Sequence, residues 1–93
     1  MREKTIEQKF VAAVKAAGGL ALKFTSPGFD GVPDRIVLLP GGKMAFVEVK
    51  AQGEKPRPLQ LARHRLLRRL GFRVYVLDDE SQIGGIVDEI RAA

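Results

Sequence analysis

Residues 31–50 read GVPDRIVLLPGGKMAFVEVK, and this stretch decides the fold. Two apolar runs of strand composition, 35–39 and 43–50, flank a Pro-Gly-Gly turn, which is typical of a β-hairpin. The second run contains two charged residues, Glu48 and Lys50, in an otherwise apolar strand. Because alternate residues of a strand point to the same face, these two side chains should lie side by side.

The length of the turn decides whether Asp34 joins this pair. With a three-residue loop, Asp34 lies opposite Glu48, and Gly42 suits the left-handed position that such a loop needs. With a two-residue loop, Asp34 would lie opposite Val49 and its side chain would point to the other face. In the first register the Cβ atoms of two carboxylates are about 4.5–5.5 Å apart, which is unfavourable for like charges. A bound cation would resolve this conflict, and oxygen ligands of this kind suit Mg²⁺.

The length and composition predict one small domain over residues 1–93. A chain of this size buries a small fraction of its surface, so self-association would help to stabilise it. The absence of cysteine excludes disulfides and thiolate metal sites. No stretch approaches the roughly 18 apolar residues of a membrane span, and the N-terminus lacks an apolar signal region. We therefore expect an intracellular protein, in the cytoplasm of a prokaryote or of a phage-infected host, with no membrane partner.

The positive charge is concentrated in one segment. The net charge is +5, and residues 55–77 carry seven basic side chains and no acidic one. The rest of the chain has nine basic and eleven acidic residues. This distribution favours a nucleic-acid partner, although a solvated helix face would give the same pattern.

The remaining periodicities predict the order α-β-β-β-α-β-α, an α/β fold with a mixed central sheet flanked by helices. The first helix should cover 5–17, with Thr5 as its N-cap, and be followed by a strand at 20–24. A glycine- and proline-bearing loop leads to the hairpin and allows close approach to a ligand. The later elements are expected at 59–70 (helix), 72–77 (strand) and 83–90 (helix), and the helix at 59–70 should bury the stripe Leu59, Ala62, Leu66 and Leu70.

Four polar residues lie near the predicted buried faces of the helices. Glu7 lies at the margin of the buried stripe of the first helix, as an acid favoured by the helix dipole or as one carried to the edge of the sheet. Glu3, one turn earlier, is the alternative. Gln60 and His64, four residues apart, share one flank of the second helix.

The Gly-Val-Pro-Asp sequence before one strand, Glu-x-Lys in the next and Gln60 at the start of the following helix resemble the PD-(D/E)XK nuclease superfamily. Within this superfamily the chain is most similar to the VRR-NUC domain. The matching stretches cover nearly the whole chain: 6–7, 31–34, 46–50, Gln60 with His64, and 70–76. The resemblance implies a restriction-endonuclease-like core.

The resemblance also implies roles for individual residues. Asp34 and Glu48 would bind Mg²⁺, for which Mn²⁺ would substitute, and the Val49 carbonyl would be a further ligand. Lys50 would be the catalytic lysine. Glu7 matches the glutamate of the first helix, as a metal ligand and catalytic residue, and Gln60 matches the glutamine that supports the site. Phosphate contacts are expected from the basic side chains Lys23, Lys55, Arg57, Arg63, Arg65 and Arg68.

These features predict a Mg²⁺-dependent, structure-selective DNA endonuclease, with four-way junctions or flaps as candidate substrates. A junction nuclease must cut two strands, which favours a homodimer. The alternative is a non-catalytic basic DNA-binding module whose acidic residues are structural. RNA is a weaker candidate, because the Phe and Tyr positions mostly suggest core residues and not a stacking platform.

Overall fold

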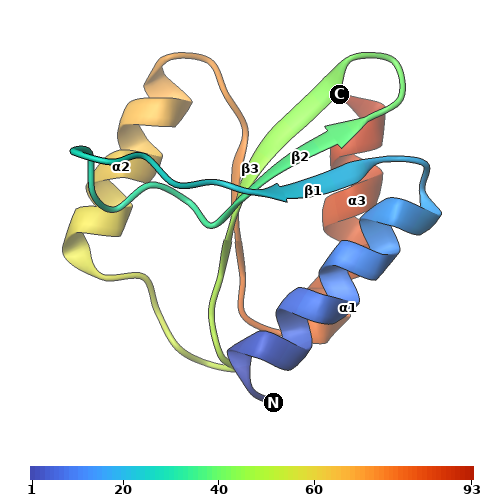
Figure 1. Ribbon diagram of the computed structural model, residues 1–93, viewed down its shortest axis with the longest axis horizontal. Coiled ribbons are helices and arrows are strands. Elements are labelled where there is room, and N and C mark those ends of the chain that lie inside the picture. Colours follow the sequence, from blue (N-terminus) through green and yellow to red (C-terminus); the bar gives the residue numbers. More distant parts are fainter.

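The computed structural model describes residues 1–93 and confirms the predicted order of elements (Figure 1). The helices are α1 (Glu3–Ala16), α2 (Pro58–Arg69) and α3 (Ile83–Ala92). The strands are β1 (Leu20–Lys23), β2 (Arg35–Leu39), β3 (Lys43–Val49) and β4 (Val74–Leu77), and a short 3₁₀ turn, η1 (Glu80–Gln82), precedes α3. None of the helices combines the length and the apolar character that crossing a membrane requires.

The four strands form one sheet in the order β1-β2-β3-β4. The first three strands are antiparallel, and β4 runs parallel to β3 after the crossover through α2. In the hairpin Leu39 pairs with Lys43, which confirms the three-residue loop. Its glycines adopt positive φ angles, 86° at Gly41 and 74° at Gly42. Continuing this register by one residue places Asp34 opposite Glu48.

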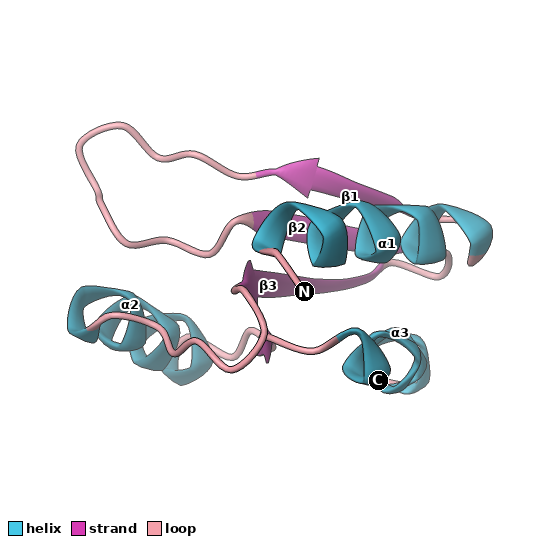
Figure 2. Ribbon diagram, turned by 90° about the horizontal axis from the view of Figure 1, so that it is seen from below, coloured by secondary structure: helices cyan, strands magenta, loops and turns pink.

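The sheet separates two helical layers, with α1 and α3 on one face and α2 on the other (Figures 1 and 2). The apolar core fills the space between the sheet and the α1–α3 layer. It contains side chains from α1, from α3 and from alternate positions of the strands: Ile6, Phe10, Val14, Val37, Leu39, Ala45, Val47, Val49, Leu77, Ile83, Ile86, Val87 and Ile90. Burial of this face therefore fixes which strand residues point toward α2 instead.

Helix α2 packs differently from the prediction. The expected apolar stripe is wrong at both of its ends, because Leu59 is exposed and Leu70 is 64% exposed. The buried residues of α2 are Gln60 and His64. The physical reason is that α2 covers the face of the sheet that carries Glu48, so its polar flank is turned inward.

Two smaller corrections concern the first helix. It begins at Glu3, and Arg2, not Thr5, is its N-cap. The backbone carbonyl of Arg2 accepts the N–H groups of Thr5 and Ile6 at 3.1 and 3.2 Å. The helix therefore extends by two residues, which makes Glu3 part of its first turn.

Candidate metal-binding site

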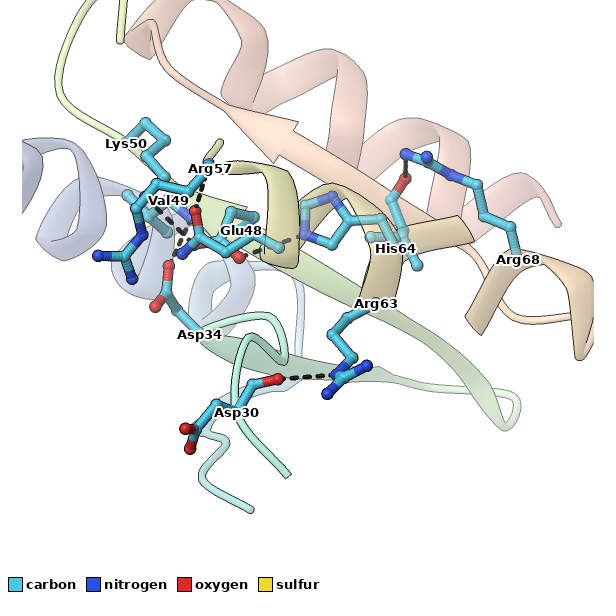
Figure 3. A network of polar contacts seen from close by, with 11 residues as sticks. Asp30, Asp34, Glu48, Val49, Lys50, Arg57, Arg63, His64 and Arg68 are labelled. Atoms are coloured by element: carbon cyan, nitrogen blue, oxygen red, sulfur yellow. Dashed lines mark hydrogen bonds and ion pairs between the residues drawn. The ribbon is translucent and has the colours of Figure 1, made fainter. Parts of the chain in front are cut away.

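Strand alternation brings the predicted site residues to the face of the sheet that α2 covers. Asp34 lies just before β2, Glu48 near the end of β3, and Lys50 just beyond it. Figure 3 shows these three side chains close together, with α2 beside them. The ammonium Nζ of Lys50 lies 3.8 Å from Oε2 of Glu48.

The carboxylate of Glu48 is buried and held by α2 through both oxygens. Its Oε1 lies 3.2 Å from Nε2 of His64, and its Oε2 accepts a hydrogen bond from Nε2 of Gln60 at 3.2 Å. The Arg57 backbone N–H donates to Oε1 of Gln60 at 2.9 Å, which orients the amide with its NH₂ toward Glu48. This network fixes the direction in which Glu48 points.

His64 is fully buried. The tautomer that carries its proton on Nε2 would donate it to Oε1 of Glu48. Its other ring nitrogen, Nδ1, is buried without a partner. The spacing of Gln60 and His64 was the signal in the sequence, but the spacing alone did not identify Glu48 as their common partner.

The Asp34 carboxyl group has fewer hydrogen-bond partners in the protein than the Glu48 carboxyl group. Burial raises the pKa of the Asp34 carboxyl to about 7, and the adjacent Glu48 acts in the same direction. The Val49 N–H, which donates to Oδ2 of Asp34 at 2.8 Å, opposes this shift. Two neighbouring carboxyl groups of which one resists ionisation form a pair that a divalent cation would relieve.

The backbone of Val49 adds a further oxygen to this pair. In a strand the N–H and C=O of one residue point to the same side, and the Val49 N–H faces Asp34. The Val49 carbonyl is therefore directed toward the same side of β3 as Asp34. Val49 lies beyond Val47, which is the last β3 residue that pairs with β2. Two carboxylates and one carbonyl form a hard oxygen donor set, which fits Mg²⁺ or Mn²⁺.

Glu7 does not join Asp34 and Glu48. Its Oε2 forms an ion pair with Nε of Arg35 at 2.9 Å, on the α1 face of the sheet. The same arginine donates to the Ala21 carbonyl at 2.9 Å, which holds the pair in place.

The structure contains no preassembled group of three His, Cys, Asp or Glu side chains that could hold a metal ion. The acid of α1 whose charge contributes to the raised pKa of Asp34 is Glu3.

The predicted phosphate-binding residues fall into two groups. Arg63 and Arg68 have partners within the chain: Arg63 Nε donates to the Asp30 carbonyl at 2.7 Å, and Arg68 donates to the Val74 carbonyl at 2.8 Å. Exposed positions are occupied by Lys23 on β1, Arg57 before α2 and Arg65 on α2. Lys55 is also exposed, and its Nζ lies 3.9 Å from Oδ2 of Asp78. Figure 3 shows Arg57 next to Asp34 and Lys50, whereas Arg68 lies at the far end of α2.

Comparison with known proteins places the chain in a family. No family model matches it. A solved structure described as "VRR_NUC domain" superposes with a TM-score of 0.86 and 33% sequence identity, over 92% of this chain and 94% of that one. The chain belongs to the VRR_NUC family. This confirms the family resemblance seen in the sequence and the mixed α/β fold.

A second comparison concerns sequence alone. The chain is 55% identical over 80 residues to "Putative nuclease p44" of Acyrthosiphon pisum secondary endosymbiont phage 1, over 86% of each chain. This VRR_NUC chain is thus similar along most of its length to a phage protein whose name describes it as a putative nuclease.

Proposed function

We propose that this protein is a Mg²⁺-dependent endonuclease that hydrolyses phosphodiester bonds in branched DNA, with Mn²⁺ as a substitute. The observation that supports this most strongly is the pair of adjacent carboxyl groups, Asp34 and Glu48. Burial and the neighbouring Glu48 raise the pKa of Asp34 to about 7, although the Lys50 ammonium lies 3.8 Å from Oε2 of Glu48, so one lysine does not offset both carboxyl groups. The similarity to a phage nuclease supports the same conclusion.

The residues that would hold the metal are Asp34, Glu48 and the carbonyl of Val49. Glu3, and not Glu7, is the acid of α1 that we propose to assist them, because Glu7 is paired with Arg35. A divalent ion at this position supplies charge neutralisation at the phosphate and lowers the pKa of a bound water. Gln60 and His64 keep the Glu48 carboxylate in a fixed direction, which limits the reorganisation needed during the reaction.

Lys50 contributes a positive charge on the same face of the sheet. Its ammonium lies 3.8 Å from Oε2 of Glu48, so the two side chains occupy one small region. In this region the Lys50 ammonium stabilises the negative charge that develops on the phosphate oxygens as the phosphodiester bond breaks. It also donates hydrogen bonds and can orient an attacking water.

Exposed basic side chains around the site account for DNA binding in this proposal. Arg57 and Lys55 lie in the segment between Lys50 and α2, and Arg65 is exposed on α2. Contacts of this type to the phosphate backbone give affinity without sequence specificity. Binding should therefore weaken steeply as the salt concentration rises.

A homodimer is part of the proposal. The α2 side of the sheet carries exposed leucines on β1 and β2. Leu20 and Leu38 pair across these strands, and both are exposed, as is Leu22. A small domain gains stability when such a surface is buried. A second copy would also bring a second site to the opposite strand of a junction.

The test is a cleavage assay with labelled four-way junction, flap and linear duplex DNA, in Mg²⁺ and in EDTA. We expect products from branched DNA in Mg²⁺, none in EDTA, and none from Glu48→Gln, which retains the size of the side chain. Glu89→Gln, at an exposed position on α3, is the control for a general loss of one negative charge. Cleavage by Glu48→Gln at the rate of the parent would refute the proposal.

The alternative of a non-catalytic DNA-binding module is favoured by one observation. Both oxygens of Glu48 already have partners inside the protein, as a purely structural acid would. In that case DNA binding persists in EDTA and no metal ion produces cleavage of any of the three substrates.

A further inference from the structure

The loop between β1 and β2 is fixed in shape and attached to α2. Residues Ser26 to Phe29 form a β-turn closed by the Phe29 N–H and the Ser26 carbonyl at 3.0 Å. Proline at the second position and Gly28, with φ of 80°, at the third match a type II turn. Farther along, Gly31 packs so closely on α2 that a Cβ atom there would lie 2.9 Å from Cγ of Leu59.

This loop presents an aromatic ring to solvent. The side chain of Phe29 is 39% exposed and lies outside the apolar core. The guanidinium carbon of Arg63 lies 3.9 Å from the centre of the ring, as in a cation–π contact. Arg63 is in turn held by the Asp30 carbonyl, an interaction visible in Figure 3. The exposed ring is therefore held in one orientation by the turn on one side and by α2 on the other.

A hollow of about 310 Å³ lies beside the ring. Phe24, Pro27 and Val32 contribute apolar walls, and Thr25 and Ser26 contribute hydroxyl groups. The volume is at the lower end of the range of about 300–1,000 Å³ for small-molecule sites. The residues that line the hollow include the acidic Asp30 and no basic residue, so a flat group with polar edges suits it better than a phosphate does.

The loop leads directly into the candidate metal site. Asp34 is the fifth residue after Phe29, so their Cα atoms are at most about 18 Å apart. A DNA strand bound at Asp34 can therefore reach Phe29 within a few nucleotides. The guanidinium of Arg63 is stacked on the ring and its Nε donates to the Asp30 carbonyl.

We propose that Phe29, Arg63 and the hollow beside them bind an unpaired nucleobase of the DNA substrate, stacked on the Phe29 ring. This inference rests on the proposed nuclease function and specifies which substrates it takes. In the interior of a duplex both faces of each base are covered by neighbouring bases, so a base outside the duplex stacks on a protein ring without the cost of opening the base stack. The site thus favours DNA with a flap, fork or open junction over continuous duplex.

The test compares binding of fluorescein-labelled forked DNA and of blunt duplex of equal length, by anisotropy in EDTA so that no cleavage occurs. The variant is Phe29→Leu, which keeps an apolar side chain without an aromatic face, and Phe29→Trp keeps the ability to stack. Phe72→Leu is the matched control, because Phe72 is also a partly exposed phenylalanine, at 43%, and lies outside the loop. A fluorescent adenine analogue in the unpaired arm reports stacking directly.

We expect Phe29→Leu to weaken binding of the fork by roughly 5- to 150-fold, the range for one base–aromatic stack. The emission change of the analogue should disappear in this variant and persist in Phe29→Trp and Phe72→Leu. Unchanged fork binding and unchanged emission in Phe29→Leu would overturn the stacking site while leaving the nuclease proposal in place. Failure of the parent protein to bind or cleave any DNA would overturn both.

Discussion

Replacing Asp34 with Asn should stabilise the metal-free protein at pH 8 and at the same time remove its metal affinity. In the folded protein the pKa of Asp34 is raised from 3.8 to about 7, mainly by burial. The folded state therefore binds this proton more tightly than the unfolded chain does. The stabilising contribution of the protonated group is complete below pH 3.8 and is lost as the pH rises toward about 7.

The size of the effect follows from the two pKa values. A difference between 3.8 and about 7 corresponds to about 4 kcal/mol at pH 8. Because Asp34 is partly exposed, solvent screening reduces this to about 2 kcal/mol. For a domain of this size, that raises the midpoint of thermal unfolding by about 8 to 16 °C. The Asn side chain still accepts the Val49 N–H, so the existing hydrogen bond is retained.

The assay is thermal unfolding followed by circular dichroism in EDTA, at pH 8 and at pH 4. Asp34→Asn should unfold at a higher temperature than the parent at pH 8 and at nearly the same temperature at pH 4. Added Mn²⁺ should raise the midpoint of the parent and leave the variant unchanged, because only the parent binds the ion. A variant that is less stable than the parent at pH 8 would refute the account of this carboxyl pair.

Three further predictions follow from other contacts. Glu3→Gln should weaken Mn²⁺ binding measured by calorimetry. Glu7→Gln should lower thermal stability and leave the Mn²⁺ affinity within about twofold of the parent. The reverse result would show that Glu7, and not Glu3, assists metal binding. His64→Leu removes a hydrogen bond to the charged Glu48, worth about 1.5–3 kcal/mol, and should lower both the unfolding midpoint and the Mn²⁺ affinity. His64→Gln should restore part of both, and equal behaviour of the two variants would contradict the positioning role. Leu38→Glu should convert a dimer to a monomer in sedimentation velocity, and a parent protein that is already monomeric would refute the proposed interface.

The hairpin and its register could be predicted from the sequence because local chemistry specifies them. The Pro-Gly-Gly loop allowed only two registers, and pairing of Leu39 with Lys43 selects the one in which Asp34 meets Glu48. The apolar positions of α1 were equally clear, since Ile6 and Phe10 are both buried. In these elements the apolar side chains and the turn residues point to the same structure.

The contacts of α2 could not be predicted in this way. Spacing assigned Leu59, Leu66 and Leu70 to the interior, on the assumption that a helix buries its apolar stripe. The face of the sheet it meets carries a buried carboxylate, and satisfying this group with Gln60 and His64 outweighs covering Leu59 and Leu70. Such a preference depends on the partner surface, which the periodicity of one helix does not contain.

The partner of Glu7 could not be predicted for a related reason. Its position on the helix was predicted correctly, at the margin of the buried stripe. Its partner, Arg35, comes from a strand 28 residues later, and only the assembled sheet shows that this arginine faces α1. The exposed ring of Phe29 was likewise missed, because a phenylalanine between glycines and a proline has no periodicity that marks it as exposed.

We propose that Asp34, Glu48 and the Val49 carbonyl hold one divalent ion, and anomalous diffraction from a crystal soaked in Mn²⁺ would locate that ion. We expect a single strong peak within about 2.5 Å of an oxygen from each of the three residues. A fully soaked crystal with no peak at this position, or with its strongest peak elsewhere, would contradict it.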